Sequence, residues 1–363
     1  MSEQFRMTRR RLLQFGAAAG AFAGALPLAS TRLLAAGPDK VKIIHASPAT
    51  LLLWSVTYLA EDMGYYKEEG LDVERAGLGG GPAAMTALLA GEGTVNVSAP
   101  GECLAANARG QRIKIIQAYT RSDPYTISVT KAFADANGIN GASPREQREK
   151  ALTAMKGKRI GITAPGSNTD LVVRMALQQV GLDASEVTIV PTGSIVNIIS
   201  ALAQGALDGG ALLAPFTEQT AAEFGAVPLL AIAAGEIPLA GRLQGQVLEA
   251  RPQDLAEKRD LFAALIRADL KALKFLKEDP NGARDKLRQT RFSKISDAVW
   301  PVAWSAALPI FASPYVPKDS IQAWIETGTV GGNPDPKTFP YDEILDMSLV
   351  DEGLRKIGWS VKS

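Results

Sequence analysis

Five short stretches of the sequence combine small or hydroxyl-bearing residues where we expect a strand to end and a helix to begin. A helix N-terminus exposes unpaired backbone N–H groups and the positive end of the helix dipole, so it can hold an anion without a lysine or arginine. The carboxyl ends of parallel strands lie at one edge of a sheet, so these helix starts are expected to converge on one site. The stretches are 48–50, 79–82, 98–101, 166–169 and 192–194.

The hydroxyl and aromatic residues of this region each have a simpler alternative role. Ser167, Thr169 and Ser194 are typical N-caps, which bond to backbone N–H groups of their own helices. Four aromatic residues near the same strand ends either line a pocket or pack in the core: Trp54, Tyr119, Tyr125 and Phe216.

No catalytic motif is complete in the sequence. A phosphate-binding loop fails because Lys158 is followed by Arg159, and a dinucleotide-binding fingerprint fails because Pro82 stands at the third glycine. A G-x-S-x-G nucleophile elbow does not occur. The single cysteine, Cys103, excludes a disulfide framework and a multi-cysteine zinc site. The single histidine, His45, excludes a His-based metal centre and most catalytic triads. We therefore expect a protein without catalytic residues, metal or cofactor.

The composition is typical of an α/β globular protein. The chain has 363 residues, enough for two domains, and 46% of them are hydrophobic. Lysine and arginine number 39 against 38 aspartates and glutamates, so no basic excess indicates nucleic-acid binding.

The N-terminus has the layout of an export signal. An arginine-rich start is followed by a weakly apolar stretch, 12–28, that is rich in alanine and glycine. The run TRRRLL at 8–13 resembles a twin-arginine signal. The alternative is a membrane anchor, but glycines and Pro27 dilute the apolar run. We predict that residues 1–36 are a cleaved signal and that the rest of the chain is periplasmic.

Strands and helices alternate through the first two thirds of the chain, which predicts mainly parallel sheets with right-handed crossovers. The last third is expected to be helical, with one long amphipathic helix at 254–278. Expected strands are 41–46, 71–76, 95–98, 113–118, 126–130, 159–163, 187–190, 210–213 and 227–232. Other expected helices are 50–63, 82–91, 101–109, 169–180, 194–204, 217–224, 281–289, 297–308 and 318–327.

A weak repeat links two parts of the chain. ALLAG at 87–91 precedes VNVSAP at 95–100, and ALAQG at 201–205 precedes ALLAP at 211–215. An acid follows each proline, namely Glu102 and Glu218. Two similar α/β halves would produce this pattern, and so would coincidence in a chain rich in alanine and leucine.

Several of these segments resemble those of a known family, the solute-binding proteins of ABC importers for nitrate, sulfonates, taurine and thiamine precursors. The most specific segment is GYYKEEGLDVE at 64–74, which matches the family pattern G-[YF]-[YF]-x-x-x-G-L-x-V-x. Softer matches are KGKRIG at 156–161, ALLAG at 87–91 and EDP at 278–280. The resemblance covers about 40–290.

The resemblance implies an α/β fold of the two-lobed type II periplasmic-binding-protein kind. Each lobe is a mainly parallel sheet flanked by helices, and the ligand cleft lies between the lobes. Lobe 1 is expected at 40–122 plus 245–363 and lobe 2 at 123–244. Ligand contacts are expected at Pro48, Thr50, Trp54, Gly80, Gly81, Ser98, Pro100, Tyr125, Ser167, Asn168, Thr169, Ser194, Ala214 and Pro215.

The function that the resemblance implies is delivery of a small solute to an ABC permease and its ATPase. The receptor would be a monomer exported by the twin-arginine machinery, and it would close on its ligand about a hinge. We expect an organic anion such as a sulfonate, taurine or a carboxylate, because helix N-termini are numerous and no carboxylate partner for a cation is evident. The alternatives are a thiamine pyrimidine precursor or another heteroaromatic solute, an enzyme related to pyrimidine synthesis, and a sensor for a membrane kinase.

Overall fold

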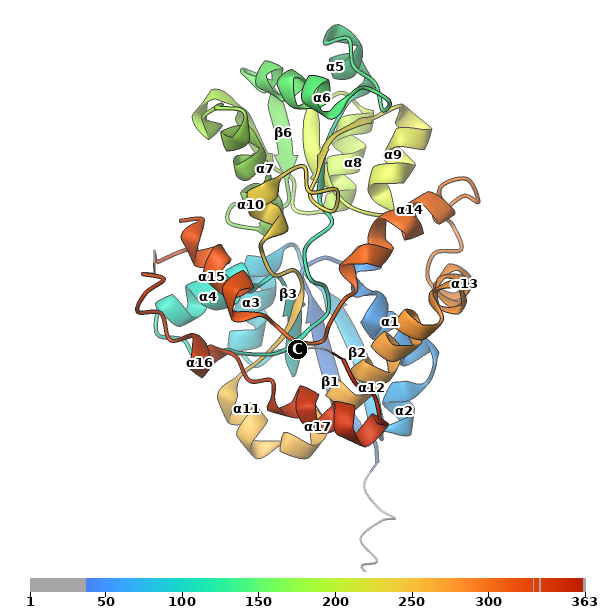
Figure 1. Cartoon of the computed structure of the whole chain (residues 1–363), viewed down its shortest axis with the longest axis vertical. Coiled ribbons are helices and arrows are strands. Elements are labelled where there is room, and N and C mark those ends of the chain that lie inside the picture. The colour runs from blue at the N-terminus through green and yellow to red at the C-terminus, as the bar shows by residue number, and fades with distance from the viewer. Residues whose placement is uncertain (1–36, 329, 333, 362–363) are drawn as a thin grey trace, which may run out of the picture. The chain divides into compact units, whose positions relative to one another are not determined.

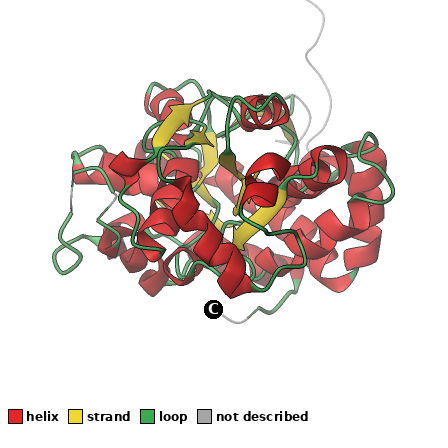
Figure 2. Ribbon diagram, turned by 90° about the horizontal axis from the view of Figure 1, so that it is seen from above, coloured by secondary structure: helices red, strands yellow, loops and turns green. Residues whose placement is uncertain are grey.

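The computed structural model describes residues 37–328, 330–332 and 334–361. The predicted signal, 1–36, lies outside the described residues. From Pro38 onward the chain builds two five-stranded sheets, each covered by helices (Figures 1 and 2). None of the helices in the described ranges has the length and apolar character needed to cross a membrane.

The first sheet has the strand order β2-β1-β3-β10-β4. β1 pairs in parallel with β2 and β3, whereas β10 is antiparallel to both β3 and β4. The short central strands β3 and β10 are buried at every residue. The strands are β1 (Asp39–His45), β2 (Leu71–Gly77), β3 (Val95–Ser98), β4 (Lys114–Ala118) and β10 (Val247–Ala250).

The second sheet has the strand order β7-β6-β8-β5-β9. β6 pairs in parallel with β7 and β8, and β5 is antiparallel to both β8 and β9. Each sheet therefore has one reversed strand in its fourth position, and the expectation of mainly parallel sheets flanked by helices is confirmed. The strands are β5 (Thr126–Val129), β6 (Arg159–Ile162), β7 (Thr188–Pro191), β8 (Gly209–Leu212) and β9 (Val227–Ala231).

Helices fill most of the connections and the last third of the described chain (Figure 1). They are η1 (Leu52–Trp54), α1 (Ser55–Asp62), α2 (Tyr65–Glu68), α3 (Gly81–Leu89), α4 (Pro100–Ala108), α5 (Lys131–Ala136), α6 (Arg145–Leu152), η2 (Thr153–Met155), α7 (Asn168–Gln179), η3 (Ala184–Glu186), α8 (Ile195–Ala203), α9 (Phe216–Phe224), α10 (Pro238–Gly241), α11 (Pro252–Glu257), α12 (Arg259–Glu278), α13 (Pro280–Thr290), α14 (Trp300–Ala307), η4 (Leu308–Ile310), α15 (Lys318–Glu326), α16 (Tyr341–Ile344) and α17 (Ser348–Ile357).

The weak sequence repeat falls on equivalent places in the two sheets. In the first, α3 leads into β3 and α4 follows; in the second, α8 leads into β8 and α9 follows. β3 and β8 also hold the same third position in their sheets. The arrangement favours two similar halves over coincidence as the origin of the repeat.

The long helix expected at 254–278 is two helices, so the prediction of a single helix is wrong. α11 ends at Glu257 and α12 begins at Arg259, because Lys258 adopts φ −125° and ψ 37°, outside the helical region. α12 then packs against α1, α2 and α17. Its buried stripe contains one acid, Asp269, whose carboxylate accepts hydrogen bonds from the hydroxyls of Tyr66 (2.7 Å) and Tyr119 (2.5 Å).

Two chain crossings connect the sheets, at 119–125 and 232–246, and they run side by side through the middle of the structure (Figure 1). The Tyr119 backbone N–H donates to the Gln246 carbonyl (2.8 Å), and the Gln246 N–H donates to the Thr120 hydroxyl (2.8 Å). Gly245 permits this approach, since a Cβ there would lie 2.3 Å from the Thr120 Oγ1. The crossings are thus bonded to each other as well as to the sheets.

We expect Phe262→Ala to destabilise the protein by about 3–5 kcal/mol, because it leaves a cavity under the fully buried face of α12. Urea denaturation followed by circular dichroism measures the change. Phe224→Ala is the matched control, since that ring is 46% exposed at the end of α9 and its loss should cost about 0.5 kcal/mol or less. Equal losses in the two variants would contradict the described packing of α12.

Candidate functional site

The helix N-termini of the two sheets face each other across a small cavity. Its volume is about 30 Å³, enough for roughly one water molecule. One side is formed by residues that follow β1 and β3, and the other by the starts of α7 and α8. Eight of the predicted contact residues line it: Trp54, Gly80, Gly81, Ser98, Tyr125, Ser167, Asn168 and Thr169.

The other six predicted contact residues lie outside this lining, and a role for them in binding stays a prediction. Pro48 and Thr50 are exposed on the loop after β1, and Pro100 is buried as the first residue of α4. The Ser194 hydroxyl caps α8 by accepting from the Asn197 N–H (3.2 Å). Two more residues precede α9: Ala214, whose carbonyl accepts from the Leu52 N–H (3.4 Å), and Pro215, the N-cap position.

Three hydroxyls form a cluster at the start of α7. The Oγ atoms of Thr163, Ser167 and Thr169 lie 2.8–3.0 Å from one another. Ser167 also caps the helix, because its hydroxyl accepts from the Asp170 N–H, and Thr169 accepts from the Thr163 N–H (2.9 Å). Ser167 therefore both caps α7 and lines the cavity, whereas Thr169 lines the cavity and bonds to the Thr163 N–H, which precedes α7.

The carboxyl of Glu102, in the first turn of α4, lines the same cavity. It lies so close to the backbone of Gly81 that a Cβ there would be 1.9 Å from its Oε1. Burial raises its pKa to about 8, with a further contribution from Asp123. No ion pair reaches Glu102 from the described residues, and the lining contains neither lysine nor arginine. Glu102 is thus a candidate carboxyl partner for a cation that was not evident in the sequence.

Two more carboxyls lie behind the lining. Asp123 accepts from the side-chain amides of Asn168 and Gln246, the latter at 3.0 Å, and burial raises its pKa to about 7. Glu249, on β10, accepts from the Asn96 amide (2.7 Å) and the Ser98 hydroxyl (3.1 Å). Burial, and then the charge of Glu102, raise the pKa of Glu249 well above its usual range. The site therefore contains three acid groups whose pKa values burial raises.

Of the four aromatic candidates, Trp54 and Tyr125 line the cavity. Trp54 is 2% exposed and packs on the ring of His45, with ring centroids 4.4 Å apart. Burial lowers the pKa of His45 to about 3, so the imidazole is neutral. Tyr119 bonds to Asp269 in the core, and Phe216 packs partly buried against the core.

Several lining residues were not predicted. They are Ala46, Ser47, Leu51, Leu53, Ala99, Glu102, Thr163, Ile195 and Gln246. Two of them carried a usable signal in the sequence. Glu102 stands two residues after a proline at a helix start, where the repeat places an acid, and Thr163 ends a predicted strand. Gln246 had no local signal, because it reaches the site through a chain crossing.

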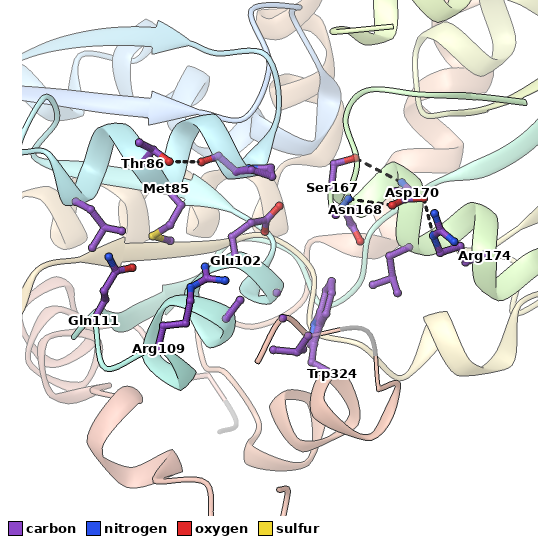
Figure 3. Close-up of a pocket in the computed structure, with 18 of the residues that line it drawn as sticks. Met85, Thr86, Glu102, Arg109, Gln111, Ser167, Asn168, Asp170, Arg174 and Trp324 are labelled. Carbon is purple, nitrogen blue, oxygen red and sulfur yellow. Dashed lines mark hydrogen bonds and ion pairs between the residues drawn. The ribbon is translucent and has the colours of Figure 1, made fainter. Parts of the chain in front are cut away.

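A wide groove adjoins the cavity and shares Glu102, Ser167 and Asn168 with it. Its volume is about 920 Å³, and it runs between α3 and α4 on one side and α7 on the other (Figure 3). In the described part of the chain no group of three or more His, Cys, Asp or Glu side chains could hold a metal ion.

The sequence matches the model of the family described as NMT1/THI5 like over residues 54–283. No curated protein matches the sequence. Among solved structures, a protein of Bordetella bronchiseptica has a TM-score of 0.75 at 21% identity, covering 89% of this chain and 99% of its own. The alkanesulfonate-binding protein SsuA of Xanthomonas axonopodis pv. citri, bound to MOPS, has a TM-score of 0.66 at 18% identity, and the match covers 86% of this chain and 100% of SsuA. The periplasmic nitrate-binding protein NrtA of Synechocystis has a TM-score of 0.67 at 14% identity, and the match covers 88% of this chain and 89% of NrtA.

The pH dependence of stability tests the state of Glu102. The pKa of this carboxyl is about 8 in the folded protein, against an ordinary value of 4.5. Between these two pH values the unfolded chain therefore binds fewer protons than the folded protein, and the unfolding free energy falls as the pH rises. Between about pH 6 and 8.5, we expect the unfolding free energy of the wild type to fall by about 1–2 kcal/mol more than that of Glu102→Gln.

Urea denaturation at the two pH values measures this difference. Glu146→Gln, which alters an exposed acid on α6, serves as the control and should follow the wild type. If Glu102→Gln loses as much stability as the wild type, the carboxyl is already ionised at neutral pH.

Proposed function

Because this chain belongs to the NMT1/THI5-like family, we propose that it is the solute-binding component of an ABC importer. It takes up a small organic solute between two lobes and delivers the solute, chemically unchanged, to a membrane permease driven by an ATPase. Family membership supports this role, as does the likeness in fold to binding proteins for alkanesulfonate and nitrate. We place lobe 1 at 40–122 plus 245–363 and lobe 2 at 123–244.

The working cycle is a hinge motion about the two crossings. The cavity has room for roughly one water molecule, so an organic solute enters only when the lobes separate. Each side of the cavity supplies part of the lining, and a bound solute therefore contacts both sides only in the closed state. This difference in contacts shifts the population toward closure.

The charge of the lining selects the class of solute. Glu102 is a partly buried carboxyl without an ion-pair partner among the described residues, and this observation carries our choice. A solute that presents a cationic nitrogen or a strong N–H donor would satisfy it. Trp54 and Tyr125 supply aromatic walls, which suits a heteroaromatic amine such as an aminopyrimidine.

An organic anion is the second candidate, favoured by the hydroxyl cluster at the start of α7. Thr163, Ser167 and Thr169 could donate to a sulfonate or carboxylate there. Such binding requires Glu102 to stay protonated, since an ionised carboxyl beside an anion is repulsive. The two candidates therefore respond to pH in opposite directions.

We expect amines and aminopyrimidines to bind more tightly at pH 9 than at pH 6, because Glu102 loses its proton near pH 8 and then attracts a donor. For ethanesulfonate or nitrate the affinity would instead fall, by up to about tenfold per pH unit above pH 8. Thermal shift screens the panel, and calorimetry at both pH values gives the affinities.

Glu102→Gln should abolish the pH dependence and weaken amine binding, whereas Glu146→Gln, far from the site in sequence and exposed, should change neither. Binding of sulfonate that is insensitive to pH, with no response to any nitrogen donor, would reject the proposed solute class.

The proposal also places the protein in the cell. Export through the twin-arginine machinery would deliver the folded chain to the periplasm, where it would act as a monomer. The buried environments of His45 and Cys103 support binding without catalysis, because burial lowers the pKa of the imidazole to about 3 and raises the pKa of the thiol well above its usual range.

A further inference from the structure

The groove beside the cavity has the size of a ligand site. Small organic ligands usually occupy pockets of about 300–1,000 Å³. The cavity, at about 30 Å³, falls far below this range, whereas the groove, at about 920 Å³, lies within it. Because Glu102, Ser167 and Asn168 belong to both, a solute held at Glu102 can extend directly into the groove (Figure 3).

Part of the groove wall is apolar. Met85, Leu89 and Ala105 form the side that belongs to α3 and α4, and Leu171 faces them from α7. The indole of Trp324 closes one end and donates to the Gln244 carbonyl (2.9 Å). Such walls suit the hydrocarbon or aromatic body of a solute.

Two charged side chains without ion-pair partners lie at opposite ends of α4. Glu102 is in its first turn and Arg109 follows its last residue, and both line the groove. No hydrogen bond or ion pair joins the Arg109 guanidinium to another described residue. By contrast, Arg174 across the groove is already held by Asp170 (2.8 Å). Arg109 is therefore the cation with free donors on this surface.

The spacing of Glu102 and Arg109 sets the length of a solute that would contact both side chains. Positions i and i+7 lie on the same face of a helix, two turns apart, which corresponds to about 10 Å along the axis. Figure 3 shows both side chains on the α4 side of the groove, opposite Asn168 and Arg174.

We propose that the solute is an elongated amphoteric molecule that lies along this groove, with a nitrogen donor at Glu102, an apolar body against α3, α4 and Trp324, and an acidic group at Arg109. The Glu102 half of this assignment rests on the proposed function. The contact with Arg109 is the new part of the proposal. It predicts that the solute carries an acidic group as well as a nitrogen donor, although the inner end of the site, at Glu102, is itself acidic.

The test uses a series of ω-aminocarboxylates, from 4-aminobutanoate to 12-aminododecanoate, with octylamine and octanoate as probes that lack one charged group. Affinity for the full chain, measured by calorimetry at pH 8.5, should peak near 8-aminooctanoate, whose extended length is about that of two helical turns. Arg109→Gln should weaken 8-aminooctanoate by about five- to tenfold, to the level of octylamine, and leave octylamine unchanged.

Arg112→Gln is the matched control, because Arg112 is an exposed arginine of the following loop that does not line the groove. Overlapping far-UV circular dichroism and equal melting temperatures establish that the variants are folded. Wild-type binding by Arg109→Gln, or failure of the wild-type protein to prefer 8-aminooctanoate over octylamine, would overturn the inference. In either case, loss of octylamine binding in Glu102→Gln would still uphold the proposed function, whereas unchanged octylamine binding in that variant would reject both.

Discussion

The carboxyl of Glu102 lies where the ends of both sheets meet, and it has no counter-charge among the described residues. Moving a carboxylate out of water costs several kcal/mol unless it is paired or protonated, and this cost is the cause of its raised pKa. Asp123 and Glu249 lie nearby with raised pKa values of their own, so ionising any one of them becomes harder when another is charged. In the proposed cycle, a nitrogen donor of the solute would replace the proton on Glu102.

The reversed strand in each sheet follows a chain crossing, and these segments carry the acid groups behind Glu102, because Asp123 lies on the first crossing and Glu249 on β10. β5 follows the first crossing and β10 follows the second, so each sheet contains one strand that arrives from the other side. The crossings are bonded to each other through Tyr119, Thr120 and Gln246, and Gln246 also binds Asp123. Asp123 in turn accepts from Asn168 at the start of α7. One chain of hydrogen bonds thus joins the crossings to the site.

Local pattern predicts much of this fold. Apolar runs located nine of the ten strands, and glycine, proline and hydroxyl residues at strand ends located the starts of α3, α4, α7 and α8, which explains why eight predicted contact residues line the cavity. The tenth strand, β10, was missed because four residues without periodicity cannot be told from a connection. The acid groups were missed for another reason. Asn96 and Glu249 are 153 residues apart in the chain, and Asp123 and Asn168 are 45 apart, so their pairing follows from topology alone.

The helix N-termini favour an anionic solute, whereas the carboxyls favour a cationic one. The sizes of these two free-energy contributions decide between them. A helix N-terminus stabilises an anion by about 0.3–1 kcal/mol near the surface and up to about 2 kcal/mol when partly buried. At α7 part of that capacity is already used, since Asp170 accepts from the Gly166 N–H and Ser167 accepts from the Asp170 N–H. At α4 the residue beside the helix end is Glu102 itself. Taking a carboxylate out of water costs several kcal/mol. This cost is larger than the stabilisation that the remaining helix N-termini would give to an anion. For the proposed solute, the inner end of the site would therefore favour a nitrogen donor, and an acidic group on the same molecule would be stabilised where a cation such as Arg109 is within reach.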